Sequence, residues 1–212
     1  MAKRATRQSL VLRRDQLALP LRQRGRGGAR ANAGRKKGPR VSRHGREKLA
    51  PRFPVHVTLK VRPEVWSLRG RLCFRALCGA FAGGRERSGF RLVHFSVQGN
   101  HLHLVVEAAD ERALARGMQG LAIRMAKGLN RAMERSGPVF ADRYHAHILR
   151  RPAEARAAVA YVLGNFAMHR AEQERPVGGG FVDPCSSDWP GADALVAPAR
   201  TWLLTRGGET SS

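Results

Sequence analysis

Apolar and polar residues alternate in three short segments, which is the pattern of strands with one buried face. These segments are residues 55–61, 90–97 and 101–107. A short turn, Gln98-Gly99-Asn100, separates the second segment from the third, so the two predict a hairpin. Residues 139–149 supply a fourth predicted strand.

Three longer segments carry apolar residues every three or four positions, as amphipathic helices do. The first covers residues 64–82, with Pro63 and Glu64 suited to its start and Gly83-Gly84 to its end. The second covers residues 111–134 and follows Asp110, a good N-cap residue. The third begins at Pro152 and runs to about residue 172.

The elements therefore follow the order β-α-β-β-α-β, with a last helix after the fourth strand. This order predicts an α+β fold, namely a ferredoxin-like, four-stranded antiparallel sheet with helices on one face. The second face is then free for a ligand or for the C-terminal helix.

Composition divides the chain into an arm, a domain and a tail. The net charge is +23, and residues 1–52 hold 17 basic and two acidic residues, a net of +15. A charge of this size indicates a polyanionic partner. We expect a disordered basic arm over residues 1–50, a domain over 51–175 and a Gly/Pro/Ser-rich tail over 176–212, either loose or docked.

Basic residues in two regions are candidates for DNA binding. The Gly-Arg-Lys-Lys-Gly-Pro-Arg run of the arm loosely resembles an AT-hook, although a solvated tail with nonspecific phosphate affinity is the simpler interpretation. The basic residues of the second helix fit a phosphate track and a solvated face equally well. The predicted DNA-binding residues are Arg26, Arg30, Arg35, Lys36, Lys37, Arg40, Arg124, Lys127 and Arg131.

The cysteines and the hydropathy of the chain predict its cellular compartment. Cys73, Cys78 and Cys185 form no Cys-x-x-Cys pair, which fits a reducing compartment. The first residues lack the apolar core of a signal peptide, and no apolar run approaches the ~20 residues that span a bilayer. We expect a cytoplasmic, nucleoid-associated protein with no membrane partner.

Two pairs of residues carry the candidate chemistry. His101 and His103 lie two apart on a strand, so both imidazoles project from one face and form half of a divalent-metal site. Tyr161 and Asn165 lie one turn apart on the last helix. A helix that brings Asn165 to a metal would therefore also bring the phenol of Tyr161 near it.

Other residues compete for these roles. His145 and His147 repeat the strand spacing, and we interpret them as a structural or DNA-facing pair, with support of the metal ligands from outside the coordination sphere as the lesser alternative. Tyr144 is the rival nucleophile, but no amide follows it four residues on. Tyr161 could instead be a core aromatic, and Asn130 a packing residue of its helix.

The string from Asn100 to Val106 resembles the His-hydrophobic-His motif of the single-tyrosine HUH transposases, most nearly the REP-associated tyrosine transposases (RAYT). The resemblance covers about residues 53–172. It differs at Gly99 and Phe166, where the family usually has proline. Further landmarks in the family's order are Asn130, the turn at residues 136–140, Tyr144, and Tyr161-Val162-x-x-Asn165.

The resemblance implies a metal-dependent endonuclease and strand transferase that acts on single-stranded DNA near hairpins or palindromes. His101, His103 and Asn165 would bind Mg²⁺ or Mn²⁺, although imidazoles alone also suit softer metals. Tyr161 would attack the DNA and leave a 5′-phosphotyrosyl protein and a free 3′-hydroxyl. A phenol, with a reference pKa of ~10, needs a cation or base nearby for this. The active unit would be a monomer or a homodimer.

Two alternatives stay open. A non-catalytic, ferredoxin-like nucleic-acid-binding module would usually present paired aromatics from the sheet centre, where this chain has His101 and His103. A small replication-initiator or relaxase-type HUH nuclease would share the chemistry but normally has more domains than this length permits.

Overall fold

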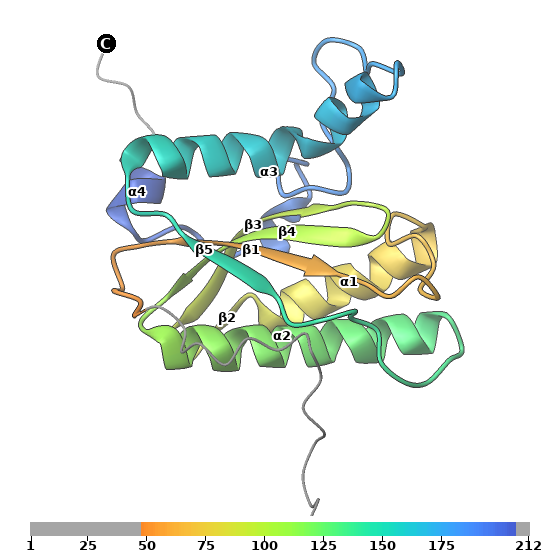
Figure 1. Ribbon diagram of the computed structural model, residues 1–212, viewed down its shortest axis with the longest axis horizontal. Helices are drawn as coiled ribbons and strands as arrows, with labels where there is room; N and C mark the ends of the chain where they lie inside the picture. The colour runs from red at the N-terminus through yellow and green to blue at the C-terminus, as the bar shows by residue number, and fades with distance from the viewer. Residues whose placement is uncertain (1–47, 207–212) are drawn as a thin grey trace, which may run out of the picture. The chain divides into compact units, whose positions relative to one another are not determined.

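The computed structural model describes residues 48–206. Five strands form an antiparallel sheet in the order β2-β3-β4-β1-β5 (Figure 1). Without the two-residue β2, this is the predicted ferredoxin-like order, with β4 and β1 in the centre. The strands are β1 (Val55–Lys60), β2 (Glu86–Arg87), β3 (Phe90–Val97), β4 (His101–Ala108) and β5 (His145–Ile148).

Helices cover both faces of the sheet. The helices α1 (Arg71–Gly84) and α2 (Glu111–Ala132) pack on one face, and α3 (Pro152–Glu172) crosses the other (Figure 1). Strand alternation assigns the side chains of β4 to the two faces. Leu102 and Leu104 enter the main core with the apolar stripe of α2, so His101 and His103 project toward α3.

Two predicted elements are wrong in their extent. The helix expected from residue 64 begins at Arg71, and the preceding residues form turns in which the Leu68 N–H donates to the Gly99 carbonyl at 2.9 Å. Val65 and Leu68 are buried, but from these turns and not from a helix. The fourth strand covers only His145–Ile148, because the chain before it makes little more than an isolated bridge between Phe140 and Val61.

The start of α2 is as predicted. Asp110 is its N-cap, and its Oδ1 accepts a 2.6 Å hydrogen bond from the Ala113 N–H. The helix ends two residues earlier than expected, at Ala132. Within the described residues, no helix is both long and apolar enough to cross a membrane.

The chain after α3 returns to the sheet and covers the free edge of β3. The Val97 N–H donates to the Cys185 carbonyl at 2.9 Å, and the Ser187 N–H donates to the Phe95 carbonyl at 2.9 Å. The short helices η1 (Ala192–Ala194) and α4 (Trp202–Thr205) follow. Of the two states that the sequence left open for the tail, the described part is docked.

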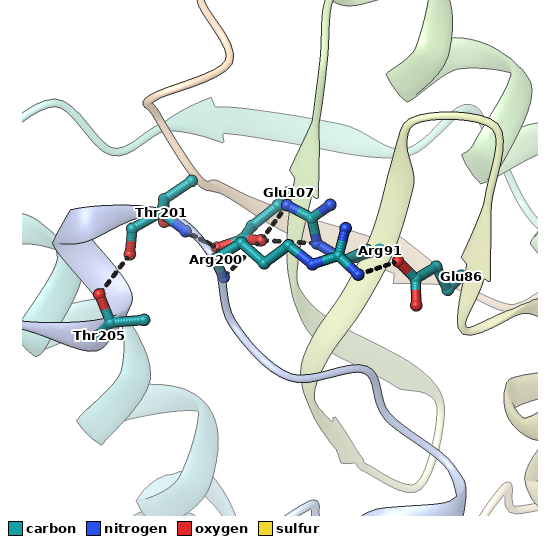
Figure 2. Close-up of polar contacts among 6 residues, drawn as sticks. All are labelled: Glu86, Arg91, Glu107, Arg200, Thr201 and Thr205. Atoms are coloured by element: carbon teal, nitrogen blue, oxygen red, sulfur yellow. Dashed lines mark hydrogen bonds and ion pairs between the residues drawn. The ribbon is translucent and has the colours of Figure 1, made fainter.

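Two carboxylates hold this C-terminal segment. Asp183 accepts hydrogen bonds of 2.6 and 2.9 Å from the guanidinium of Arg69, which lies 3.7 Å over the ring of Phe166 in α3. Glu107 at the end of β4 accepts hydrogen bonds from Arg91 and from Thr201 (Figure 2). Burial raises the pKa of Glu107, but these hydrogen bonds outweigh it and lower the pKa overall.

Candidate active site

Histidines gather on the sheet face that α3 covers. Residues directly opposite each other in an antiparallel sheet share a face. His103 is opposite Thr58, which is also opposite His145, and His56 is opposite His147. The strand histidines on this face are His56, His94, His101, His103, His145 and His147.

His103 is the most enclosed member of this group. Its side chain is 6% exposed, and its Nδ1 lies 3.2 Å from His56 Nε2 and 3.3 Å from Thr58 Oγ1. Its other nitrogen, Nε2, is buried with no hydrogen-bond partner among residues 48–206. Burial, together with the neighbouring imidazoles, lowers the pKa of His103 to about 3. The ring is therefore neutral at pH 7 and has the form that binds a metal.

His101 stands next to His103 on β4, with the two ring centroids 4.8 Å apart. Its Nδ1 lies 2.8 Å from Oδ1 of Asn100, in the turn before the strand. Burial lowers the pKa of His101, and the charges of His169 and Lys60 add to the effect. Both β4 imidazoles thus have a partner at Nδ1.

One stripe of α3 lies over these rings. The centroid of the Tyr161 ring is 5.1 Å from that of His103 and 5.9 Å from that of His56, and the ring is edge-on to both. Two turns further on, the His169 ring is 6.4 Å from the His101 ring. Asn165 is one turn from each, on the same side of the helix, so its side chain lies between them.

Asn165 is a polar residue in a buried position. Its side chain is 0% exposed, whereas the other buried residues of α3 are Ala155, Ala158 and Val162. Neither its Oδ1 nor its Nδ2 has a hydrogen-bond partner within the described chain. An unpaired buried amide costs about 1–3 kcal/mol, so its position favours a polar ligand at this point.

The donors present fit a hard-to-borderline divalent cation with open coordination positions. Two imidazole nitrogens and one amide oxygen leave room for phosphate and water oxygens, which Mg²⁺ and Mn²⁺ favour. Over residues 48–206, no group of three or more His, Cys, Asp or Glu side chains has a metal-binding arrangement. The amide of Asn165 is a candidate third donor, because it is buried and unpaired on the helix above the two imidazoles.

A hollow next to His101 extends the site toward β5. Its charged lining residues are Lys60, Arg143 and Asp142, and Thr58, Asn100 and His145 also line it. Two cations against one carboxylate give this hollow a net positive charge, which suits a backbone phosphate.

The other predicted residues lie away from this site. Arg124, Lys127 and Arg131 line a groove with Arg75 between α1 and α2, which are on the opposite face of the sheet (Figure 1). The predicted arm residues Arg26, Arg30, Arg35, Lys36, Lys37 and Arg40 lie outside the described residues.

Tyr144 and Asn130, the alternatives that the sequence offered, have packing and turn-forming contacts instead. Tyr144 packs against the main core and shares a hollow with Met118 of α2, on the face away from His103. Asn130 donates a 2.8 Å hydrogen bond from Nδ2 to the Gly137 carbonyl and holds the turn after α2.

Sequence reasoning did not single out His56 or His169. His56 lies within the predicted strand 55–61, two residues from Thr58, so both belong to the polar face of that strand. His169 follows Asn165 by one helical turn. Helical spacing could have revealed His169, but the contact of His56 depends on strand pairing across 47 positions.

No protein-family model matches the sequence, and no curated protein matches it either. Among solved structures, the chain is similar to a REP-associated tyrosine transposase bound to a REP hairpin. The TM-score is 0.53 at 16% identity, over 71% of this chain and 92% of that chain. A Deinococcus radiodurans R1 protein assigned as a transposase aligns with a TM-score of 0.39 at 14% identity, over 65% and 98% of the two chains. The first likeness shows a transposase-like fold.

Proposed function

We propose that this protein is a metal-dependent DNA-processing enzyme of the HUH tyrosine-transposase type. The observation that carries the proposal is the position of Tyr161 and Asn165 on one stripe of α3, above the imidazoles of His101 and His103.

In this proposal, His101 and His103 would hold the cation through ring nitrogens and Asn165 through its amide oxygen. When bound, Mg²⁺ or Mn²⁺ neutralises charge on the scissile phosphate and orients it. The Tyr161 side chain is 37% exposed, so a strand in solution can reach it and its proton can leave to water.

The phenol oxygen of Tyr161 attacks the phosphorus, and the bond from phosphorus to the 3′ oxygen breaks. The 3′ oxygen takes up a proton and leaves as a free hydroxyl, while the 5′ phosphate stays on Tyr161. The phosphotyrosine keeps the energy of the phosphodiester, so a 3′-hydroxyl can attack it to reseal or transfer the strand.

The proposed substrate is single-stranded DNA next to a hairpin. The REP-hairpin complex of the solved neighbour and the positive charge of this chain support this choice. Lys60 and Arg143 beside His101 would hold the backbone near the reacting phosphate. The basic arm and the α1–α2 groove would add salt-sensitive affinity that does not depend on sequence.

Covalent capture tests this function. The full-length chain is incubated with a labelled hairpin-bearing single strand and Mn²⁺, and a denaturing gel is examined for a protein–DNA adduct. Tyr161→Phe should form no adduct, and Tyr144→Phe should form it at the wild-type level. An adduct that persists in Tyr161→Phe would refute the assignment of the nucleophile. Tight binding without any adduct would indicate a non-catalytic binding module instead.

A further inference from the structure

We infer that His56 is a positioning residue, which holds the ring of His103 in the form and orientation that a cation requires. The inference rests on the proposed metal site and adds to it a residue on a different strand.

The contact between the two rings is close and follows from the sheet. His56 Nε2 lies 3.2 Å from His103 Nδ1, and the rings stack with centroids 5.3 Å apart and planes 28° from parallel. The pairing of β1 with β4 places Thr58 opposite His103, which brings His56 within reach along the same strand.

The hydrogen-bond partners of His103 can hold the tautomer that a metal requires. A neutral imidazole has one N–H and one lone pair. If Nε2 of His103 is to donate its lone pair to a cation, Nδ1 must carry the hydrogen and needs an acceptor. His56 Nε2 and Thr58 Oγ1 are the two candidate acceptors within 3.3 Å, and both lie on β1.

His101 shows the same arrangement with another partner. Its Nδ1 is next to the side-chain oxygen of Asn100, an atom that can only accept, so this nitrogen carries the hydrogen. Both candidate ligands would then hold their Nε2 lone pairs free. Partners of this kind on metal-binding histidines fix the tautomer and the ring direction, and their loss typically weakens metal binding 10–100-fold.

His56 also touches the reacting group, since its ring is 5.9 Å from that of Tyr161. The test must therefore separate metal binding from the attack by the phenol. For this reason it measures the binding of Mn²⁺ alone to the full-length protein, without DNA, by isothermal titration calorimetry.

His56→Ala should weaken Mn²⁺ binding by roughly 10–100-fold. His56→Gln, which can present an oxygen acceptor, should recover part of the loss. His147→Ala is the matched control, because His147 is the cross-strand neighbour of His56 and is exposed, and it should bind like the wild type. Thermal unfolding of each metal-free variant shows whether it still folds.

Nitrogen-15 NMR of the imidazoles gives a second, independent readout on the wild-type chain. Metal-free His103 should be the Nδ1–H tautomer. An Nε2–H tautomer, or wild-type Mn²⁺ affinity in a folded His56→Ala protein, would overturn the inference and leave the proposed function standing. Absence of Mn²⁺ binding by the wild-type chain would overturn the proposed metal site and the inference together.

Discussion

The backbone N–H of Thr201 donates a 2.7 Å hydrogen bond to Oε1 of Glu107, across 94 positions of the sequence (Figure 2). The hydroxyl of Thr201 donates to the same oxygen at 2.8 Å, and Arg91 pairs with the other oxygen at 2.7 Å. Glu107 is on β4, the strand that presents His101 and His103 to α3. One buried carboxylate thus fixes the C-terminal segment to the strand of the candidate site.

Replacing Glu107 by alanine should lower the free energy of unfolding by about 3–5 kcal/mol, because Arg91 and the N–H of Thr201 lose their buried partner. Urea denaturation measures the change. Glu86→Ala is the control, since Glu86 is an exposed partner of Arg200 and its loss should cost less than about 1 kcal/mol. Equal effects of the two variants would contradict the role of Glu107 in holding the C-terminal segment.

Replacing either of two glycines of α2 by alanine should change the stability of the fold, in opposite directions for the two positions. A Cβ at Gly117 would overlap the ring of Phe90, whereas none of the described atoms lies near a Cβ at Gly120. Gly117→Ala should therefore destabilise the fold by about 1–3 kcal/mol. Gly120→Ala should stabilise it by about 0.5–1 kcal/mol, since alanine favours the helix. Thermal unfolding of both variants checks this pair, and a shared sign would contradict the packing of β3 on α2.

Local signals in the sequence predicted the fold well where local interactions determine it. Asp110 caps α2 because its side chain bonds only three residues ahead. The start of α1 was missed because Leu68 is buried by a turn that bonds to Gly99, a contact across 31 positions that spacing does not reveal. The fourth strand was overestimated because its pairing with β1 stops at Thr58 and His145, two residues before β1 ends, and spacing in the sequence does not reveal where pairing stops.

The same limit applies to the candidate site. The spacing of His101 with His103 and of Tyr161 with Asn165 predicted which residues share a strand face and a helix face. Their approach to one another depends on α3 crossing the sheet, which the sequence leaves open. His56 was missed because its contact with His103 requires the register of β1 on β4.

The buried imidazole of His103 should make stability depend on pH. Burial lowers its pKa from 6.5 to about 3, so the unfolded chain binds a proton between these values and the folded chain does not. Stability therefore falls as pH falls through this window, by at most about 1.4 kcal/mol per pH unit from this group.

Urea denaturation of metal-free protein from pH 7 to pH 4 tests this dependence. The free energy of unfolding of His103→Gln should fall less steeply than that of the wild type. His145→Gln, which alters an exposed histidine on the same face, should follow the wild type. Parallel curves for the wild type and His103→Gln would contradict the pKa assigned to His103.

The basic groove between α1 and α2 should contribute affinity without contributing chemistry. DNA binding is measured by fluorescence anisotropy at several salt concentrations, and the logarithm of the binding constant is plotted against the logarithm of the salt concentration. Lys127→Ala or Arg131→Ala should make the slope of this plot shallower by up to about 0.7–0.9. Arg112→Ala, on the exposed start of α2 and outside the groove, should leave the slope unchanged. An unchanged slope in the groove variants would show that phosphates do not bind there.

Mapping the covalent bond tests the central claim most directly, because the chain has only two tyrosines. The adduct formed with Mn²⁺ and a hairpin-bearing single strand is digested with protease and nuclease, and the modified peptide is sequenced by mass spectrometry. We predict a nucleotide attached through its 5′ phosphate to Tyr161. A nucleotide on Tyr144, or on any residue other than Tyr161, would contradict the account.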